Sequence, residues 1–202
     1  MSELYKALSL IAPIGMLAVF FETNWVHNAV KSALALGVGA VLVPSFSYHS
    51  LCHFGKLEDL IDNKARRLDQ SGQHVANALI AFALSGCPIY FAAVSTYSIS
   101  GIALLWLRGE HDKPFYRRAF IFFTICLSLA PMVWRRDYPN LVGAAATLAV
   151  MIPLFARGGT CHSVSHLLLA PYIYFIYKSA DVVAVHFDKV HHVAGAHGMV
   201  AS

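Results

Sequence analysis

Residues 75–107 read VANALIAFALSGCPIYFAAVSTYSISGIALLWL, and this stretch decides how many helices the chain forms. As one α-helix it would be about 50 Å long, whereas the hydrocarbon core of a bilayer is about 30 Å thick. The stretch therefore has to break or tilt steeply. Ser85-Gly86-Cys87-Pro88 is the expected breaking point, because Gly and Pro together end a helix and the residue before Pro avoids the α region. Such a break turns one apolar stretch into two membrane helices.

The composition is that of a membrane protein. Apolar residues make up 57% of the 202 residues and charged residues only 13%, and the mean hydropathy is +0.58. One compact soluble domain of this length cannot hide so much apolar surface, and the apolar residues come in long runs. The formal charge of +4 comes from basic residues in short loops, which indicates membrane topology and not nucleic-acid binding. The four cysteines form no CxxC pair, so they indicate neither a disulfide framework nor a metal site.

The apolar stretches predict an all-α, polytopic membrane protein with seven transmembrane helices, forming a single domain over residues 1–202. The predicted spans are residues 4–21, 32–54, 68–84, 89–107, 115–134, 141–155 and 162–185. No small-residue cleavage site follows the first stretch, so we expect a membrane helix there and not a signal peptide. Pro171 lies inside the last span, and residues from about 186 to 202 are expected to form a mobile polar tail.

Basic residues are divided unevenly between the two sides that seven spans create. One side holds the N-terminus and the loops after the second, fourth and sixth spans. Its basic residues are Lys6, Lys56, Lys64, Arg66, Arg67, Arg108, Lys113, Arg117, Arg118 and Arg157, whereas the other side carries Lys31, Arg135, Arg136, Lys178 and Lys189. By the positive-inside rule, the first side is cytoplasmic and the N-terminus lies in the cytoplasm.

Five polar residues lie at span ends on that same side. Ser45 and His49 are four residues apart near the end of the second span, and His162 and His166 have the same spacing in the last span. Residues at i and i+4 share a helix face, so each helix offers polar groups in one direction. Asp69 stands at the start of the third span. Ionisable residues in membrane spans are costly and usually mark a functional site.

Three neutral imidazoles with one open position are the donor set of a catalytic zinc, whereas a structural zinc normally has four protein ligands. His49, His162 and His166 would supply the three. Asp69 could hydrogen-bond a water at the metal, act as general base, or orient a ligand; it could also cap the helix, and these roles can coexist. His53 and Cys161 are weaker candidates for ligands. His74 is expected to be a hydrogen-bonded interior histidine.

The order of these motifs resembles the CREST superfamily of seven-helix membrane proteins. That group includes the adiponectin and progestin receptors, the alkaline ceramidases, a GPI-anchor lipid-remodelling branch and the myomaker-like proteins. The matching pattern is S-x-x-x-H with Ser45 and His49, L-D-x-S-G with Asp69, and H-x-x-x-H with His162 and His166. The resemblance implies a zinc ion bound by the three histidines, with Asp69 and Ser45 close to it.

Within the superfamily, the chain looks most similar to the myomaker-like branch. The similarity rests on Tyr48-His49-Ser50, on the loop Gly109-Glu110-His111-Asp112-Lys113-Pro114, and on His162-Ser163 before His166. The spacing differs, since myomaker-like chains have a longer segment before the last helix and a shorter one around the third and fourth.

The leading hypothesis is a zinc-dependent hydrolase of a lipid amide or ester bond at the cytoplasmic side of the bilayer. Asp69 would accept the proton, Ser45 would help to stabilise the oxyanion, and a ceramide, phospholipid or GPI-lipid would be the partner. The alternative is a non-enzymatic membrane-remodelling, fusion or receptor protein in which zinc ties two helices together. A channel or transporter ranks third, because the polar groups gather near one side and no matching set is recognised at mid-depth.

Overall fold

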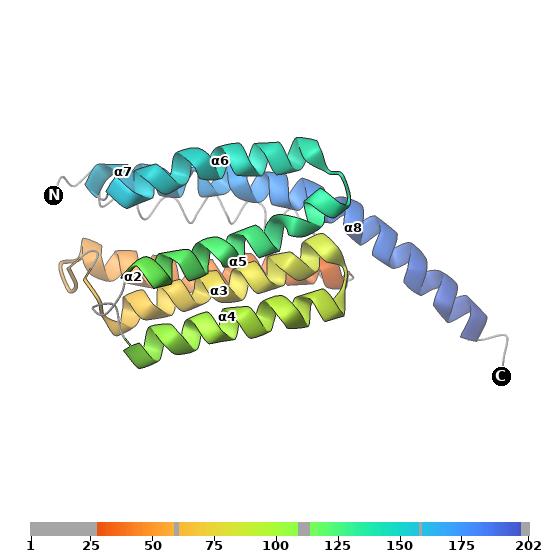
Figure 1. Cartoon of the computed structure of the whole chain (residues 1–202), viewed down its shortest axis with the longest axis horizontal. Coiled ribbons are helices and arrows are strands. Elements are labelled where there is room, and N and C mark those ends of the chain that lie inside the picture. The colour runs from red at the N-terminus through yellow and green to blue at the C-terminus, as the bar shows by residue number, and fades with distance from the viewer. Residues whose placement is uncertain (1–27, 59–60, 109–113, 158, 199–202) are drawn as a thin grey trace.

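The computed structural model describes residues 28–58, 61–108, 114–157 and 159–198, and every regular element within these ranges is an α-helix. The helices are α2 (Ala29–His53), α3 (Lys64–Ser85), α4 (Pro88–Arg108), α5 (Pro114–Trp134), α6 (Tyr138–Arg157), α7 (Gly159–Leu167) and α8 (Leu169–Gly198). The long helices run side by side as a bundle (Figure 1). The all-α prediction is therefore confirmed. The predicted span over residues 4–21 lies outside the described residues.

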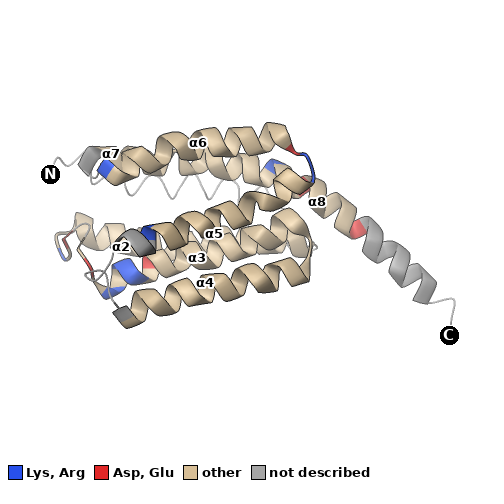
Figure 2. Ribbon diagram, in the orientation of Figure 1, with Lys and Arg blue, Asp and Glu red and all other residues tan. Residues whose placement is uncertain are grey.

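Four segments are long and apolar enough to cross a membrane, which is consistent with a membrane protein. They are Ala29–His53, Pro88–Leu107, Tyr138–Arg157 and Val164–Asp188, and a shorter apolar segment covers Arg118–Trp134. Large apolar side chains are exposed along the outside of the bundle, among them Leu36, Ile99 and Val142. Lys, Arg, Asp and Glu lie mainly toward the two ends of the bundle (Figure 2). Such a distribution suits a belt of lipid around the middle of the helices.

The central helix of the bundle is α3, which packs against α2, α4, α5 and α8. It is too polar to be among the four apolar segments, yet its polar side chains are enclosed by its neighbours. Asp69, Gln70, Ser71, His74 and Asn77 are all buried. Polar groups within a membrane protein are stable only when they face the interior of the bundle. Surrounding helices can therefore shield α3 from lipid.

Buried polar pairs lie half-way along α3, where none was predicted from the sequence. The His74 Nδ1 atom lies 3.3 Å from Thr124 Oγ1 of α5, and Ser128 of α5 donates to Asn77 Oδ1 at 3.4 Å. All four side chains are at most 8% exposed. These pairs link α3 to α5 through interhelical hydrogen bonds, as polar residues in membrane bundles do. The prediction that His74 is a hydrogen-bonded interior residue is confirmed.

The predicted break between residues 85 and 88 is confirmed. Gly86 follows the end of α3 with φ +62°, a left-handed conformation that costs glycine little because it has no Cβ. Its N–H donates to the Phe82 carbonyl at 2.7 Å, and α4 begins directly after it at Pro88. Proline is favoured at the first position of a helix because the missing N–H would have no helical partner there.

The start of α3 differs from the prediction. The helix begins at Lys64, one turn before the expected residue 68, because the Asn63 side chain accepts a hydrogen bond from the Arg66 N–H at 2.9 Å. Asp69 is therefore in the second turn and does not cap the helix. The dipole at the N-terminus of α3 therefore does not account for the buried carboxylate of Asp69.

The last predicted span, residues 162–185, matches the apolar segment Val164–Asp188, but the helix is not continuous as predicted, because it is interrupted at Leu168. Leu168 separates α7 from α8. Pro171 favours the interruption, because it has no N–H to donate to the Leu167 carbonyl and its ring clashes with that carbonyl in a regular helix. Beyond Val185 the backbone remains helical and α8 continues to Gly198.

Candidate metal centre

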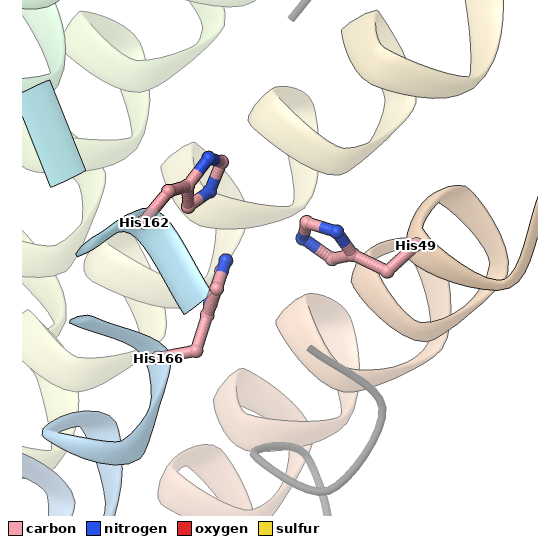
Figure 3. Close-up of side chains that lie close together, drawn as sticks. All are labelled: His49, His162 and His166. Atoms are coloured by element: carbon pink, nitrogen blue, oxygen red, sulfur yellow. The ribbon is translucent and has the colours of Figure 1, made fainter. Parts of the chain in front are cut away.

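Three histidines meet where the C-terminal end of α2 approaches α7. His49 lies one turn before the end of α2, and His162 and His166 are one turn apart on α7. Their ligand nitrogens all lie within 4.8 Å of one another. In Figure 3 the three rings converge on a common space from the two helices. The structure therefore brings together the three predicted ligands as a possible metal site.

The geometry of the rings fits a metal ion. The ring centroids of His49 and His166 are 4.7 Å apart with an interplanar angle of 78°, and those of His162 and His166 are 4.8 Å apart at 27°. Tetrahedral zinc with Zn–N bonds of about 2.0–2.1 Å holds its ligand nitrogens about 3.3 Å apart. Closing the remaining gap of at most about 1.5 Å requires only small rotations of the imidazoles. The donor set and its spacing therefore fit a metal ion.

An apolar wall shields one side of the cluster. His49 is 5% exposed and His162 is 3% exposed, while His166 is half-buried. The ring centroids of Phe155 on α6 and His162 are 4.4 Å apart, and the Ser165 hydroxyl donates to the His162 carbonyl at 2.5 Å. Phe155 was not predicted from the sequence, because an aromatic residue in an apolar span carries no distinguishing local signal.

The other two predicted site residues form a pair beside the cluster. The Ser45 hydroxyl hydrogen-bonds to the Asp69 carboxylate, which also interacts electrostatically with Arg66. Ser45 and Asp69 are 5% and 7% exposed, and Asp69 Oδ1 is buried with no hydrogen-bond partner among the described residues. Ser45 precedes His49 by one helical turn, which is about 5.4 Å along α2. Arg66 was not predicted, although its place three residues before Asp69 on one helix face was a usable signal.

Close packing of α2 on α3 brings this pair together. A Cβ atom on Gly72 would overlap the carbonyl oxygen of Ala40, and one on Gly37 would lie 3.3 Å from the carbonyl oxygen of Ala76. Small residues at these positions let the two backbones approach closely. Because of this approach, short side chains such as serine and aspartate can reach each other across the interface.

No match emerges when the chain is compared with protein-family models, curated proteins and solved structures. The resemblance to the CREST superfamily, and to its myomaker-like branch, stays a prediction.

The weaker candidates for ligands do not join the cluster. The group of described residues that could hold a metal ion contains His49, His162 and His166, without His53, Cys161 or a carboxylate. The His53 ring instead lies 5.1 Å from that of Phe54, and Cys161 is a partly buried free thiol. Within the described part of the chain, the three histidines could supply three ligands to a metal ion, which would leave a fourth position for another group.

Proposed function

We propose that this protein is a zinc-dependent membrane hydrolase that cleaves an amide or ester bond of a lipid, of the ceramide, phospholipid or GPI-lipid type. The observation that carries the proposal is the convergence of His49, His162 and His166, with His49 one helical turn from Ser45 of the Ser45–Asp69 pair. A metal site with three histidines and a nearby buried carboxylate is the arrangement of a catalytic centre. A structural zinc normally has a fourth protein ligand.

Each residue has a role in this proposal. Zinc, when bound by the three histidines, supplies Lewis acidity toward a carbonyl oxygen. Asp69 Oδ1 has the free acceptor capacity to take a proton from an attacking water. Arg66 compensates the charge of Asp69. The Ser45 hydroxyl holds the carboxylate in place and turns toward the developing oxyanion during the reaction.

Lipid can reach this site from the side of the bundle. Phe155 touches His162 and is itself 42% exposed, and Val164 and Leu167 on α7 are 36% and 39% exposed. These apolar side chains would face lipid tails if the helices span a bilayer. An acyl chain lying against them would bring its carbonyl to the histidine end of the bundle.

The proposal includes seven spans and a cytoplasmic N-terminus. The seven would be residues 4–21, then α2 to α6, and last α7 together with α8. Basic residues at the histidine end support this orientation. Lys56 follows α2, Arg157 ends α6, and α3 begins with Lys64, Arg66 and Arg67. Figure 2 shows Lys and Arg in blue at this end. The reaction would then take place at the cytoplasmic face of the membrane.

The test is elemental analysis and hydrolysis by the purified protein, with His162→Ala against wild type. We expect one zinc per wild-type chain and release of fatty acid from a panel of ceramides, phospholipids and GPI-lipids, with both lost in the variant. His53→Ala is the matched control, because His53 lies one turn beyond His49 on α2 and outside the cluster. It should retain zinc and activity. Hydrolysis by a metal-free His162→Ala variant would contradict the proposal.

A non-enzymatic role, as in the myomaker-like proteins, is the second candidate. One observation favours it: α7 packs mainly on α6 and α8, and α2 packs mainly on α3 and α8. A metal bound by His49 from α2 and by His162 and His166 from α7 would link α2 to α7, two helices that otherwise make few contacts with each other. A zinc-loaded protein that is inert toward the whole lipid panel, and that loses its fold on chelation, would support this role.

A further inference from the structure

A groove lies at the end of the bundle opposite to the histidines. It is formed where α3 ends, α4 begins and α5 ends, and it has a volume of about 450 Å³. Its lining includes Cys87, Ile89, Tyr90, Ala93, Trp134 and Arg135. In Figure 1 the α3–α4 and α5–α6 connections lie at the right, whereas α7 lies at the left. The groove is therefore separate from the candidate metal centre.

The walls of the groove are apolar and open outward. Ile89 is 81% exposed and Trp134 is 65% exposed. The Tyr90 hydroxyl donates to the Leu127 carbonyl at 2.6 Å, and its ring packs edge-on against Trp134 with centroids 5.0 Å apart. These contacts fix the aromatic wall. In a bilayer, an outward-facing apolar groove at a helix end lies beside the upper part of the acyl chains, where aromatic residues are enriched.

Arg135 places a positive charge in this apolar lining. Its guanidinium donates to Ser179 Oγ at 2.7 Å and to the Ser179 carbonyl at 3.3 Å, so its position is held by α8. Its Nε atom is buried and has no hydrogen-bond partner in the part of the chain that the structure describes. A buried charge is stable only when an opposite charge or enough hydrogen bonds compensate it.

No described carboxylate forms an ion pair with Arg135. The nearest in sequence is Asp137, and its Oδ1 accepts a hydrogen bond from Asn140 at 2.9 Å instead. Burial lowers the pKa of Arg135, and the charge of Asp137 opposes that effect. A guanidinium nevertheless stays protonated in proteins. The groove therefore contains a partly desolvated cation that lacks a direct anionic partner among the described side chains.

The turn after α5 separates Arg135 from the next arginine. The Arg136 N–H donates to the Val133 carbonyl at 3.0 Å, and the Asp137 N–H donates to the Met132 carbonyl at 2.9 Å. This pair of bonds is a Schellman motif, with Arg136 in the left-handed conformation at φ 57°. Arg136 is exposed and does not line the groove. Two adjacent arginines thus have different surroundings.

We propose that this groove binds a phospholipid with an anionic head group. The acyl chain lies along Ile89, Ala93 and Trp134, and the phosphate accepts hydrogen bonds from Arg135. An apolar groove alone would take any lipid tail. The guanidinium adds charge complementarity, because it binds phosphate oxygens with strong, directional hydrogen bonds. This inference does not depend on hydrolysis at the histidine cluster.

The test uses quenching of Trp134 by brominated lipids. Trp25→Phe and Trp106→Phe leave Trp134 as the only tryptophan of the three. This variant is reconstituted in phosphatidylcholine vesicles with rising fractions of brominated phosphatidylglycerol or brominated phosphatidylcholine. We expect half-maximal quenching at an about tenfold lower fraction of the anionic lipid, the effect of one charged hydrogen-bonded contact.

Two further variants decide whether the groove is responsible. Arg135→Gln should abolish the preference for the anionic lipid, whereas Arg136→Gln, its exposed neighbour, should keep it. Ala93→Phe fills the groove without changing charge and should also abolish the preference, so it serves if Arg135→Gln fails to fold. Equal quenching by the two lipids in the starting variant would overturn the proposal. A preference that survives Arg135→Gln or Ala93→Phe would do the same.

Discussion

Ser45 donates a hydrogen bond to the carboxylate of Asp69 and thereby joins α2 to α3 one helical turn from His49. The pair is almost fully buried, and Asp69 Oδ1 has no further hydrogen-bond partner among the residues described. A buried acceptor with spare capacity beside a cluster of three histidines is costly for stability alone. A role of Asp69 Oδ1 as a proton acceptor in a reaction would account for this cost in stability.

Asp69→Asn tests this role because it removes the charge and nearly keeps the shape. General base catalysis contributes about 10²–10⁴-fold, so hydrolysis should fall at least about a hundredfold. Zinc per chain should stay at the wild-type value, because Asp69 is not among the three ligands. Both quantities are measured on the same preparation. Wild-type turnover by the variant would show that Asp69 is not the base.

Gly72→Val should separate α2 from α3, because any Cβ at this position overlaps the Ala40 carbonyl oxygen. Overpacking of this kind costs about 1–3 kcal/mol, and the shift of α2 should also weaken zinc binding through His49. Gly39→Ala is the control, because a Cβ built there has no atom within 4 Å beyond its own stretch of helix. Thermal unfolding in detergent and zinc content measure the two effects. Equal melting temperatures for the two variants would contradict the close packing.

Gly101 and His74 should be energetically coupled. A Cβ on Gly101 would lie 2.7 Å from His74 Cε1, and the His74 ring is buried and held near Thr124. Gly101→Ala should therefore destabilise the protein by about 1–3 kcal/mol in the wild-type background. In a His74→Ala background the same change should cost less, with a coupling energy of about 0.5–3 kcal/mol. Strict additivity of the two changes would rule out the contact.

Arg136→Gly should stabilise the protein. Arg136 has φ 57° at the end of α5, and this conformation costs a residue with a Cβ about 1–2 kcal/mol relative to glycine. Arg136→Ala removes the same charge but keeps the Cβ, so it separates the backbone effect from electrostatics. The melting temperature in detergent should rise for the glycine variant only. A rise of equal size in both variants would attribute the gain to charge.

Helix ends were predictable wherever the chain carries a local signal. Gly86 and Pro88 ended one helix and began the next, because one supplies the left-handed turn and the other fits the first helical position. The start of α3 was missed because Asp69 was considered as a cap, whereas Asn63, six residues earlier, caps the helix. The interruption at Leu168 was also missed. A proline inside a helix can kink it or end it, and the packing of α7 decides between them.

The sequence by itself determined that the chain is helical and apolar, and that Ser45/His49 and His162/His166 are pairs on single helix faces. These properties follow from composition and from the 3.6-residue period, which need no tertiary contact. Only the tertiary structure decided that His49 meets the two histidines of α7, and that Arg135 enters a groove while Arg136 does not. Contacts between helices depend on the distance between the helix axes, and residues far apart in the chain set that distance.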